Sequence, residues 1–308
     1  MRRGLIELGS NSFRLVVADA AGPIETRSHY LGLARSVSAH GSLTGDDILT
    51  AARIARELHH CAVDLGCDQI AVVATEAFRL ASNGEAAAKR IGDAIGGGVR
   101  ILTPEEEVTL AYEAVFLDGL SPQGFVMIDL GGGSLGVAAG RPGQLRPDVT
   151  ASYRMGVHLL APRVLSGELL PTAGRIRLEH FITEQLDDLP VHPDALDRLP
   201  VVVVGGAARS IARIIHTARR AAVPDSERGL VIDCADLGHL IGRTSDLPRS
   251  GRLALPGVKP HRADTLPLAA TILRQVLRHL GAEHATVSAV GLREGGLGRL
   301  QTTERRAA

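Results

Sequence analysis

The chain has 308 residues, of which 45% are hydrophobic and 3% aromatic, a composition typical of a globular protein long enough for two domains of ordinary size. Lys and Arg together number 34, as do Asp and Glu, so no global field attracts nucleic acid or an acidic membrane, and a polyanion would need a local positive site. No apolar run approaches the roughly 20 residues that span a bilayer, and three cysteines are too few for a disulfide framework or a zinc site, so we expect a cytoplasmic protein without a nucleic-acid or membrane partner.

The first part of the chain alternates between predicted strands and helices. Its best-defined helix has Thr44 as N-cap, acids in the first turn and apolar residues at helical spacing. Such alternation is typical of an α/β domain. In chain order we predict strands with turns over residues 3–36, a helix at 44–65, a strand at 69–74, a helix at 85–95, a strand at 99–102 and a helix at 104–117.

The second part repeats this plan after a turn-rich segment, residues 118–124, which is the best linker candidate. We therefore expect an N-terminal domain of residues 1–119 and a C-terminal domain of residues 120–308, and we leave open that the last helix packs back on the first domain. In chain order we predict a hairpin at 125–137, a strand at 149–153, helices at 159–165 and 173–186, a strand at 199–204, helices at about 207–221 and 265–280, and a strand at 285–290.

Residues 125–134 hold the most informative pattern in the chain, an apolar run that ends in an acid and is followed by three glycines and a serine. Glycines carry no Cβ, so successive backbone N–H groups can converge on an anion. Asp129, near the strand end, is placed to hold a divalent cation or a water beside that anion. An ordinary Gly-rich turn of a hairpin fits this pattern equally well.

A second segment with the same plan lies near the N-terminus. Residues 5–19 place Glu7 near the end of an apolar strand, follow it with Gly9 and three small polar residues, and continue into another apolar strand. The repetition favours a duplicated phosphate-binding hairpin over an ordinary turn. Two such loops predict a cleft.

Seven short motifs are spread over nearly the whole chain, at residues 7–14, 74–83, 105–112, 128–134, 155–157, 262–264 and 291–295. In this order they resemble the exopolyphosphatase and guanosine pentaphosphate phosphohydrolase (Ppx/GppA) family. The resemblance implies an α/β fold of two ribonuclease-H-like domains facing across a cleft, as in the actin, sugar kinase and heat-shock chaperone superfamily with its actin-like ATPase fold. It also implies that phosphate chains bind between the domains and that Mg²⁺ assists their hydrolysis.

The resemblance assigns Glu107 as the catalytic base that activates the attacking water. A carboxylate suits this role, because burial and nearby acids raise its proton affinity. The residues alone leave another interpretation open, in which Glu105 to Glu107 only favour a helix N-terminus through its dipole. Asp129 matches the family acid that binds metal or positions water, and Glu7 is assigned with it as a magnesium ligand.

Phosphate binding is assigned to both loops, through backbone and hydroxyl donors, and to two arginines that act as charge-assisted ligands. Judged alone, an arginine is more often a surface ion-pair residue. Arg293, in the last motif, is expected to have a structural role at the domain junction. The residues assigned to phosphate by the resemblance are Ser10, Asn11, Ser12, Arg79, Gly131, Gly132, Gly133, Ser134 and Arg262.

The chain departs from the family pattern at the site itself. Glu7 stands where the family usually has Asp, so the carboxylate reaches further into the cleft. Gly136 stands where the family has a second carboxylate, and Ala207 where it has a threonine hydroxyl. Val108 and Thr109 replace an Ala-Arg pair, which removes a positive charge near the base. These changes imply a weaker metal site, an altered substrate choice or a reduced rate.

Three functions are compatible with these motifs. The leading hypothesis is a hydrolase that releases the terminal phosphate of inorganic polyphosphate or of guanosine pentaphosphate. The alternative is a catalytically weak or inactive sensor that binds polyphosphate or a guanosine alarmone, motivated by Gly136 and Ala207. A kinase or ATPase is third, and would need an adenosine pocket that the sequence does not reveal. The chain resembles the short, two-domain members of the family, among whose relatives a homodimer is common.

Overall fold

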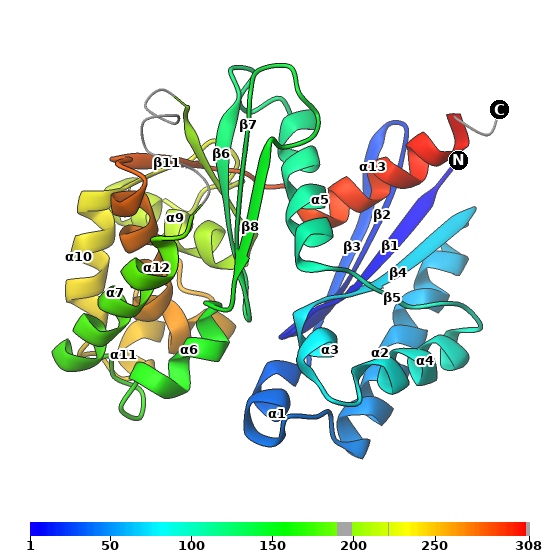
Figure 1. The fold of residues 1–308 in the computed structure, drawn as a ribbon, viewed down its shortest axis with the longest axis horizontal. Helices are drawn as coiled ribbons and strands as arrows, with labels where there is room; N and C mark the ends of the chain where they lie inside the picture. The colour runs from blue at the N-terminus through cyan, green and yellow to red at the C-terminus, as the bar shows by residue number, and fades with distance from the viewer. Residues whose placement is uncertain (190–198, 221, 306–308) are drawn as a thin grey trace. The chain divides into compact units, whose positions relative to one another are not determined.

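The computed structural model describes residues 1–189, 199–220 and 222–305, arranged as helices and strands of α/β type (Figure 1). The chain forms two compact units. One comprises residues 1–114 with the segment from Leu292 onward, and the other comprises Val115–Gly291. The expected domain boundary at residues 119–120 lies in the turn that follows α5 (Pro104–Leu117).

The first unit is built on a five-stranded mixed sheet. Its strand order is β3-β2-β1-β4-β5. The first three strands form an antiparallel meander, whereas β4 and β5 run parallel to β1. The strands are β1 (Arg3–Leu8), β2 (Ser12–Asp19), β3 (Gly22–Tyr30), β4 (Gln69–Ala74) and β5 (Arg100–Ile101).

Helices cover both faces of this sheet. Because successive residues of a strand point to opposite faces, one strand contributes side chains to both cores. Ile6 and Leu8 of β1 pack into one core with α2 and α4. Leu5, which precedes Ile6 in the sequence, packs on the other face with Leu110 of α5 and Leu297 of α13. The helices of this unit are α1 (Leu33–His40), α2 (Gly45–Asp64), α3 (Glu76–Leu80), α4 (Gly84–Ile95), α5 and α13 (Leu292–Arg305).

Local signals place two of these helices. Thr44 caps α2 as predicted, since its hydroxyl accepts the Asp47 N–H at 3.1 Å while the Asp47 carboxylate accepts the Thr44 N–H at 2.9 Å. Residues 33–40, however, form α1, where the sequence predicts strands and turns up to residue 36. Leu33 and Val37, one helical turn apart, are its buried residues, and this short stripe is easily read as a turn.

The second unit is built on a six-stranded mixed sheet of order β10-β11-β9-β6-β7-β8. β6, β7 and β8 form an antiparallel meander, β9 and β11 run parallel to β6, and β10 adds an antiparallel edge. The strands are β6 (Phe125–Leu130), β7 (Leu135–Gly140), β8 (Val149–Tyr153), β9 (Val201–Val204), β10 (Val231–Asp233) and β11 (His284–Val287).

Apart from its extra edge strand, the second sheet has the strand order and strand directions of the first. Each unit thus has a ribonuclease-H-like α/β arrangement, and the predicted duplication of the hairpin is confirmed at the level of the backbone. The predicted strand at 285–290 is shorter, since β11 ends at Val287.

The helices of the second unit pack on its sheet around one large core. α12 lies between α7 and α10, with α6 and α9 beside them (Figure 1). α9 begins two residues earlier than predicted, and residue 221, to which that prediction ran, lies outside the described residues. The helices are α6 (Val157–Val164), α7 (Thr172–Leu186), α9 (Gly205–Arg220), α10 (Cys234–Thr244), α11 (Arg249–Leu253), the 3-10 turn η1 (Pro260–Thr265) and α12 (Leu266–His279). Within the described part of the chain, no helix has the length and apolar character needed to cross a membrane.

Candidate active site

The glycine loop between β6 and β7 is held by the start of α6. Backbone N–H groups at that start donate to the loop carbonyls: Val157 to Gly131 at 3.2 Å, His158 to Gly132 at 2.7 Å, and Gly156 to Gly133 at 2.7 Å. All peptide bonds of the described chain are trans, so the N–H in each of these peptide planes points away from its carbonyl, and therefore away from α6.

Two consequences follow for the amides of this loop. The Gly131 N–H closes the hairpin by donating to the Ser134 carbonyl at 2.9 Å. Among the described residues, no hydrogen bond uses the N–H of Gly132 or Gly133. These adjacent donors on the side away from α6 form the type of concave amide surface that binds oxyanions.

The loop between β1 and β2 has the same backbone design. The Gly9 N–H donates to the Ser12 carbonyl at 3.2 Å, the Ala34 N–H of α1 donates to the Ser10 carbonyl at 2.8 Å, and the Leu31 and Gly32 N–H groups both donate to Asn11 at 3.0 Å. The N–H groups of Asn11 and Ser12 therefore point away from α1. The two loops to which the sequence assigns phosphate binding therefore share one backbone design.

Tight backbone packing fixes the glycine loop between β6 and β7. A Cβ at Gly156 would lie 2.1 Å from the carbonyl carbon of Gly133 and 2.4 Å from that of Gly132. Real Cβ atoms essentially never approach so closely, so only glycine lets the start of α6 lie against the loop. This requirement accounts for the small residue in the motif at 155–157.

Asp129 lies beside this loop, next to last in β6. Its carboxylate oxygen is 2.9 Å from the place a Cβ would take at Gly205, whose φ of 92° also favours glycine. Gly136 of β7 is directly opposite Asp129 in the antiparallel ladder, so the side-chain position left empty at Gly136 is on the same face. The second carboxylate of the family pattern, which this chain lacks at position 136, would therefore lie beside Asp129.

Arg262 lies at the same edge of the second unit. A Cβ at Gly206 would be 2.1 Å from its Nη2 atom, so the guanidinium lies directly on the first turn of α9. Ala207, where the family pattern has threonine, is buried in that turn at 3% exposure. The second unit therefore brings Asp129, the glycine loop and Arg262 to one edge of its sheet.

The three glutamates that begin α5 have separate roles. Glu105 is exposed. Glu106 belongs to the helix cap, because its carboxylate accepts the Thr103 N–H at 3.0 Å, its own N–H donates to the Thr103 hydroxyl at 3.2 Å, and it also pairs with Arg100. Glu107 takes no part in the cap. Its Oε2 atom lies 2.8 Å from Nη2 of Arg79, and the two side chains are 19% and 16% exposed.

The electrostatics of Glu107 suit a base. Burial raises the pKa of its carboxyl above the ordinary value, and the negative charge of Glu7 raises it further, while Arg79 acts in the opposite direction. The interpretation that the three glutamates serve only the helix dipole therefore fails for Glu107, whose partner is a side chain of α3. Arg79 is itself positioned by donating from Nη1 to the Leu102 carbonyl at 2.7 Å.

Glu7 has a partner that the sequence did not predict. Nε of Arg293 lies 3.7 Å from Oε2 of Glu7, and the two side chains are 11% and 20% exposed. The first unit therefore brings together Glu7, Arg79, Glu107 and Arg293 beside the loop of Ser10 to Ser12. Arg293 was expected only to hold the domain junction. The signal that could have drawn attention to it is an arginine in a motif that returns the chain to the first unit.

Comparison with known proteins settles the family. A model of the Ppx/GppA phosphatase family matches residues 16–304. The chain belongs to this family. Among curated relatives, Exopolyphosphatase 1 of Mycobacterium leprae (strain TN) is 27% identical over 310 residues, covering 96% of this chain and 88% of the relative. Exopolyphosphatase 1 of Mycobacterium tuberculosis (strain ATCC 25618 / H37Rv) is 29% identical over 308 residues, covering 96% and 87%.

Solved structures agree in fold. An exopolyphosphatase from Cytophaga hutchinsonii superposes with a TM-score of 0.87 at 20% identity, covering 98% of each chain. The Ppx/GppA family member from Aquifex aeolicus superposes with a TM-score of 0.83 at 24% identity, covering 99% of this chain and 98% of that one. The two-unit α/β architecture is therefore that of Ppx/GppA phosphatases.

The donor chemistry of this Ppx/GppA chain fits magnesium. Mg²⁺ prefers oxygen ligands and is usually bound by one or two carboxylates together with substrate phosphates. Glu7 and Asp129 each place one carboxylate beside the glycine-bearing loop of their own unit. Among the described residues, no three His, Cys, Asp or Glu side chains gather as a metal cluster, so a magnesium ion at either carboxylate would take further ligands from phosphate oxygens or water.

Proposed function

We propose that this protein is a phosphoanhydride hydrolase that releases the terminal phosphate of inorganic polyphosphate or of guanosine pentaphosphate. The observation that carries the proposal is the position of Glu107, a partly buried carboxylate outside the helix cap whose pKa is raised and whose partner is an arginine. A carboxylate with raised proton affinity is suited to take a proton from water near neutral pH.

In the proposed reaction, the oxygen of a water molecule bonds to the terminal phosphorus and the bridging P–O bond breaks. The proton of the water passes to Glu107, and the shortened chain leaves with the bonding electron pair. The backbone amides of the two loops bind phosphate oxygens, and Arg262 offsets their charge.

Arg79 would change partners during this reaction. In the structure it binds the Glu107 carboxylate and lowers its pKa. When Arg79 turns to a phosphate oxygen, Glu107 loses that neighbouring positive charge, so its proton affinity rises as the substrate arrives. The same ion pair would thus link phosphate binding to activation of the base.

Magnesium is the proposed cofactor, with Glu7 and Asp129 as its protein ligands. When bound, it would neutralise charge on the phosphoryl oxygens. The protein's own groups would bind and orient the phosphates and take the proton from water, as described above.

One observation favours the alternative function, a catalytically weak or inactive sensor of the same ligands. Gly136 leaves no second carboxylate on the face of the ladder that carries Asp129. A phosphate chain could then bind to the loops without the metal being held firmly enough for rapid hydrolysis.

A single panel separates these functions. Phosphate release would be measured from polyphosphate, guanosine pentaphosphate and ATP, with and without magnesium, for the parent, Glu107→Gln and Glu105→Gln. A hydrolase predicts release by the parent, its loss in Glu107→Gln and no change in Glu105→Gln, since Glu105 is exposed in the same helical turn. Tight binding without release at any magnesium concentration would instead identify a sensor. Release from ATP alone would identify an ATPase.

A further inference from the structure

β3 is the longest strand at an edge of either sheet. It has nine residues, whereas β5, at the other edge of the same sheet, has two, and the edge strands β10 and β8 of the second sheet have three and five. Within the described part of the chain, no strand pairs with the outer side of β3. An edge of this kind presents backbone N–H and C=O groups that can pair with another chain.

Both faces of β3 are open in the middle of the strand. Thr26, Arg27 and Ser28 are consecutive, so their side chains point to alternate faces, and all three are exposed. Neither face of the sheet is therefore buried under a helix at these residues. Another strand can lie beside β3 here and continue the sheet.

One hydrogen bond shows which backbone groups point to this open edge. The Thr26 N–H donates to Oε1 of Glu25, its neighbour in the chain, at 3.1 Å, and so is not used by the ladder with β2. The N–H and C=O of one residue in an antiparallel strand point to the same side. Thr26 therefore turns both groups outward, and the Glu25 carboxylate covers the outward N–H.

The N-terminal end of the edge is less suited to pairing. Pro23 has no N–H, and Ile24 has no partner in the register with β2, which shifts at this point. Such a bulge twists the strand locally and interrupts a regular ladder. Regular pairing with β2 extends over residues 25–30, so a new strand would have to pair within this segment and would form a short ladder.

Charge selects one register for a second copy of the same strand. In an antiparallel pair with two-fold symmetry, one residue lies opposite its own copy. A pair centred on Glu25 or on Arg27 would place like charges opposite each other, and a pair centred on Ser28 would place Arg27 opposite His29. A pair centred on Thr26 instead places Glu25 of each copy opposite Arg27 of the other, so the charges are complementary twice.

We propose that β3 is the interface of a homodimer in which two copies of this chain pair edge to edge about Thr26. The Thr26 N–H of each copy donates to the Thr26 carbonyl of the other, and the released Glu25 carboxylate pairs with Arg27 across the interface. The two five-stranded sheets then form one continuous sheet. Because the ladder is short and buries little area, the dissociation constant should be on the order of 10–100 µM.

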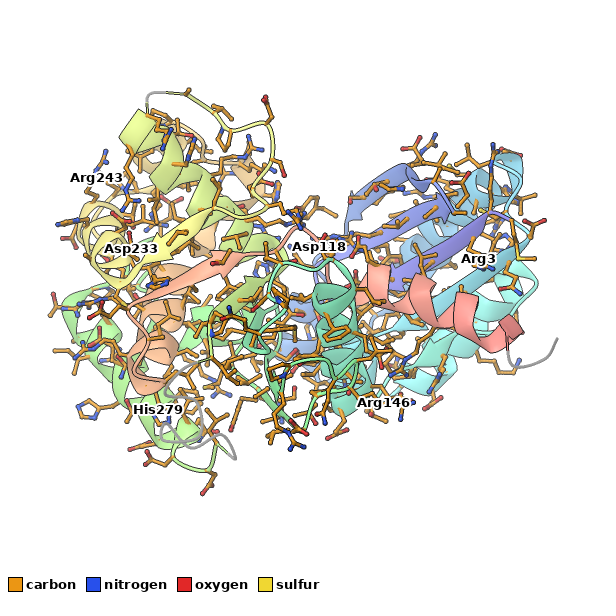
Figure 2. The ribbon with its side chains drawn as sticks, turned by 90° about the horizontal axis from the view of Figure 1, so that it is seen from above. Arg3, Asp118, Arg146, Asp233, Arg243 and His279 are labelled. Carbon is orange, nitrogen blue, oxygen red and sulfur yellow. The ribbon has the colours of Figure 1, made fainter. Side chains whose placement is uncertain are left out.

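Sedimentation velocity over roughly 5–500 µM protein measures this dimer. Arg27→Glu and Glu25→Arg each convert both attractive pairs into repulsive ones, so each should weaken dimerisation roughly tenfold or more. Thr26→Pro removes the outward N–H, which the ladder with β2 does not use, and should weaken it similarly. The matched control is Arg243→Glu, at an exposed arginine of α10 in the second unit (Figure 2), which should dimerise like the parent.

Mixing the two charge variants tests the register itself. In an equimolar mixture, the two acids of the Arg27→Glu strand lie opposite the two arginines of the Glu25→Arg strand. The variants should therefore form a heterodimer with roughly the affinity of the parent, although each alone dimerises weakly. The double variant Glu25→Arg/Arg27→Glu, which exchanges the charges within one chain, should also recover dimerisation. Recovery shows that the single variants are folded.

A parent that stays monomeric at the highest concentration would overturn the proposal. So would a parent dimer that Arg27→Glu and Thr26→Pro leave unchanged, or a mixture and a double variant that both fail to recover dimerisation while circular dichroism shows folded protein. None of these outcomes depends on phosphate release, because the interface does not rest on the proposed hydrolase. The protein could prove to be a sensor and still dimerise through β3.

Discussion

Asp129 and Gly136 stand directly opposite each other on β6 and β7. Side chains at such paired positions have Cβ atoms about 5 Å apart on one face of the sheet. In the first unit the same register pairs Glu7 with Arg14. Each hairpin thus presents a single acid beside its loop, and in the second unit the facing position has no side chain at all.

Gly136→Glu is expected to restore a second carboxylate beside Asp129. Because Gly136 is buried, the added charge should lower the melting temperature without magnesium, and saturating magnesium should recover part of that loss. The magnesium concentration for half-maximal phosphate release should fall. Gly136→Gln, which has the same size without the charge, is the control. Equal magnesium dependence in the two variants would contradict this account of position 136.

The activity of the parent should depend on pH through Glu107. The base must be deprotonated, and its pKa is raised by burial and by Glu7, so kcat/KM should fall with acidification at a higher pH than an ordinary glutamate would give. Arg79→Met removes the charge that opposes this shift, so the acid limb should move to still higher pH. If the acid limb of the kcat/KM profile has the same midpoint in Arg79→Met as in the parent, a group other than Glu107 controls it.

The same carboxyl should affect stability in the opposite direction to activity. A glutamate whose folded pKa is raised binds its proton more tightly when folded, so its contribution to stability falls as pH rises from the unfolded pKa through the folded one. The free energy of unfolding of Glu107→Gln should therefore equal or exceed that of the parent at pH 8. The advantage of the variant should be smaller at low pH, where Glu107 of the parent is protonated. Thermal unfolding across pH would show this, with Glu105→Gln expected to track the parent.

Arg252 should be a large contributor to the stability of the second unit. It is fully buried, and its guanidinium donates to four backbone carbonyls, those of Thr244 at 3.0 Å, Ala263 at 3.1 Å, Asp264 at 3.2 Å and Glu168. Arg252→Met would leave these acceptors unsatisfied and should cost about 3 kcal/mol or more in denaturant unfolding.

A nearby arginine provides the control for that prediction. Arg249 begins the same short helix and pairs with Asp264 at 3.0 Å, but its side chain is 41% exposed. Arg249→Met should therefore cost less than about 1 kcal/mol. Equal losses in the two variants would show that the buried carbonyl contacts do not dominate.

Gly156→Ala should damage the glycine loop. The new methyl group would overlap the backbone of Gly132 and Gly133, so α6 or the loop must shift. This shift should lower the free energy of unfolding by about 2 kcal/mol or more and weaken phosphate binding. Gly242→Ala in α10 has open space and should be neutral or stabilising by up to about 1 kcal/mol. Orthophosphate binding by calorimetry and thermal unfolding would test both.

Much of this architecture could be predicted because local signals agree with the fold. The acid, glycine loop and flanking apolar strands of each hairpin follow from the sequence alone, as does the cap at Thr44. The family pattern singles out Glu107 from three adjacent glutamates, and in the structure Glu107 is the one of the three that pairs with Arg79. Residue type alone could not single out Glu107. Glu105, Glu106 and Glu107 are chemically identical and differ only in the direction in which each side chain leaves the first turn of α5.

Other features depend on contacts between distant parts of the sequence. Arg252 carries no local sign of full burial, since arginine is usually exposed. Arg293 meets Glu7 only because the last helix returns to the first sheet. Arg262 lies on Gly206 only because residues 257–262 pack against a helix some 50 positions earlier in the chain. None of these follows from periodicity or spacing.

The hydrogen bonds from the start of α6 to three successive glycine carbonyls have one more consequence. A run of three glycines would ordinarily lose much conformational entropy on binding a ligand, but here the peptide planes are already fixed by the helix. Phosphate would meet a rigid, preorganised receptor, so the glycines of this loop serve close approach and not mobility.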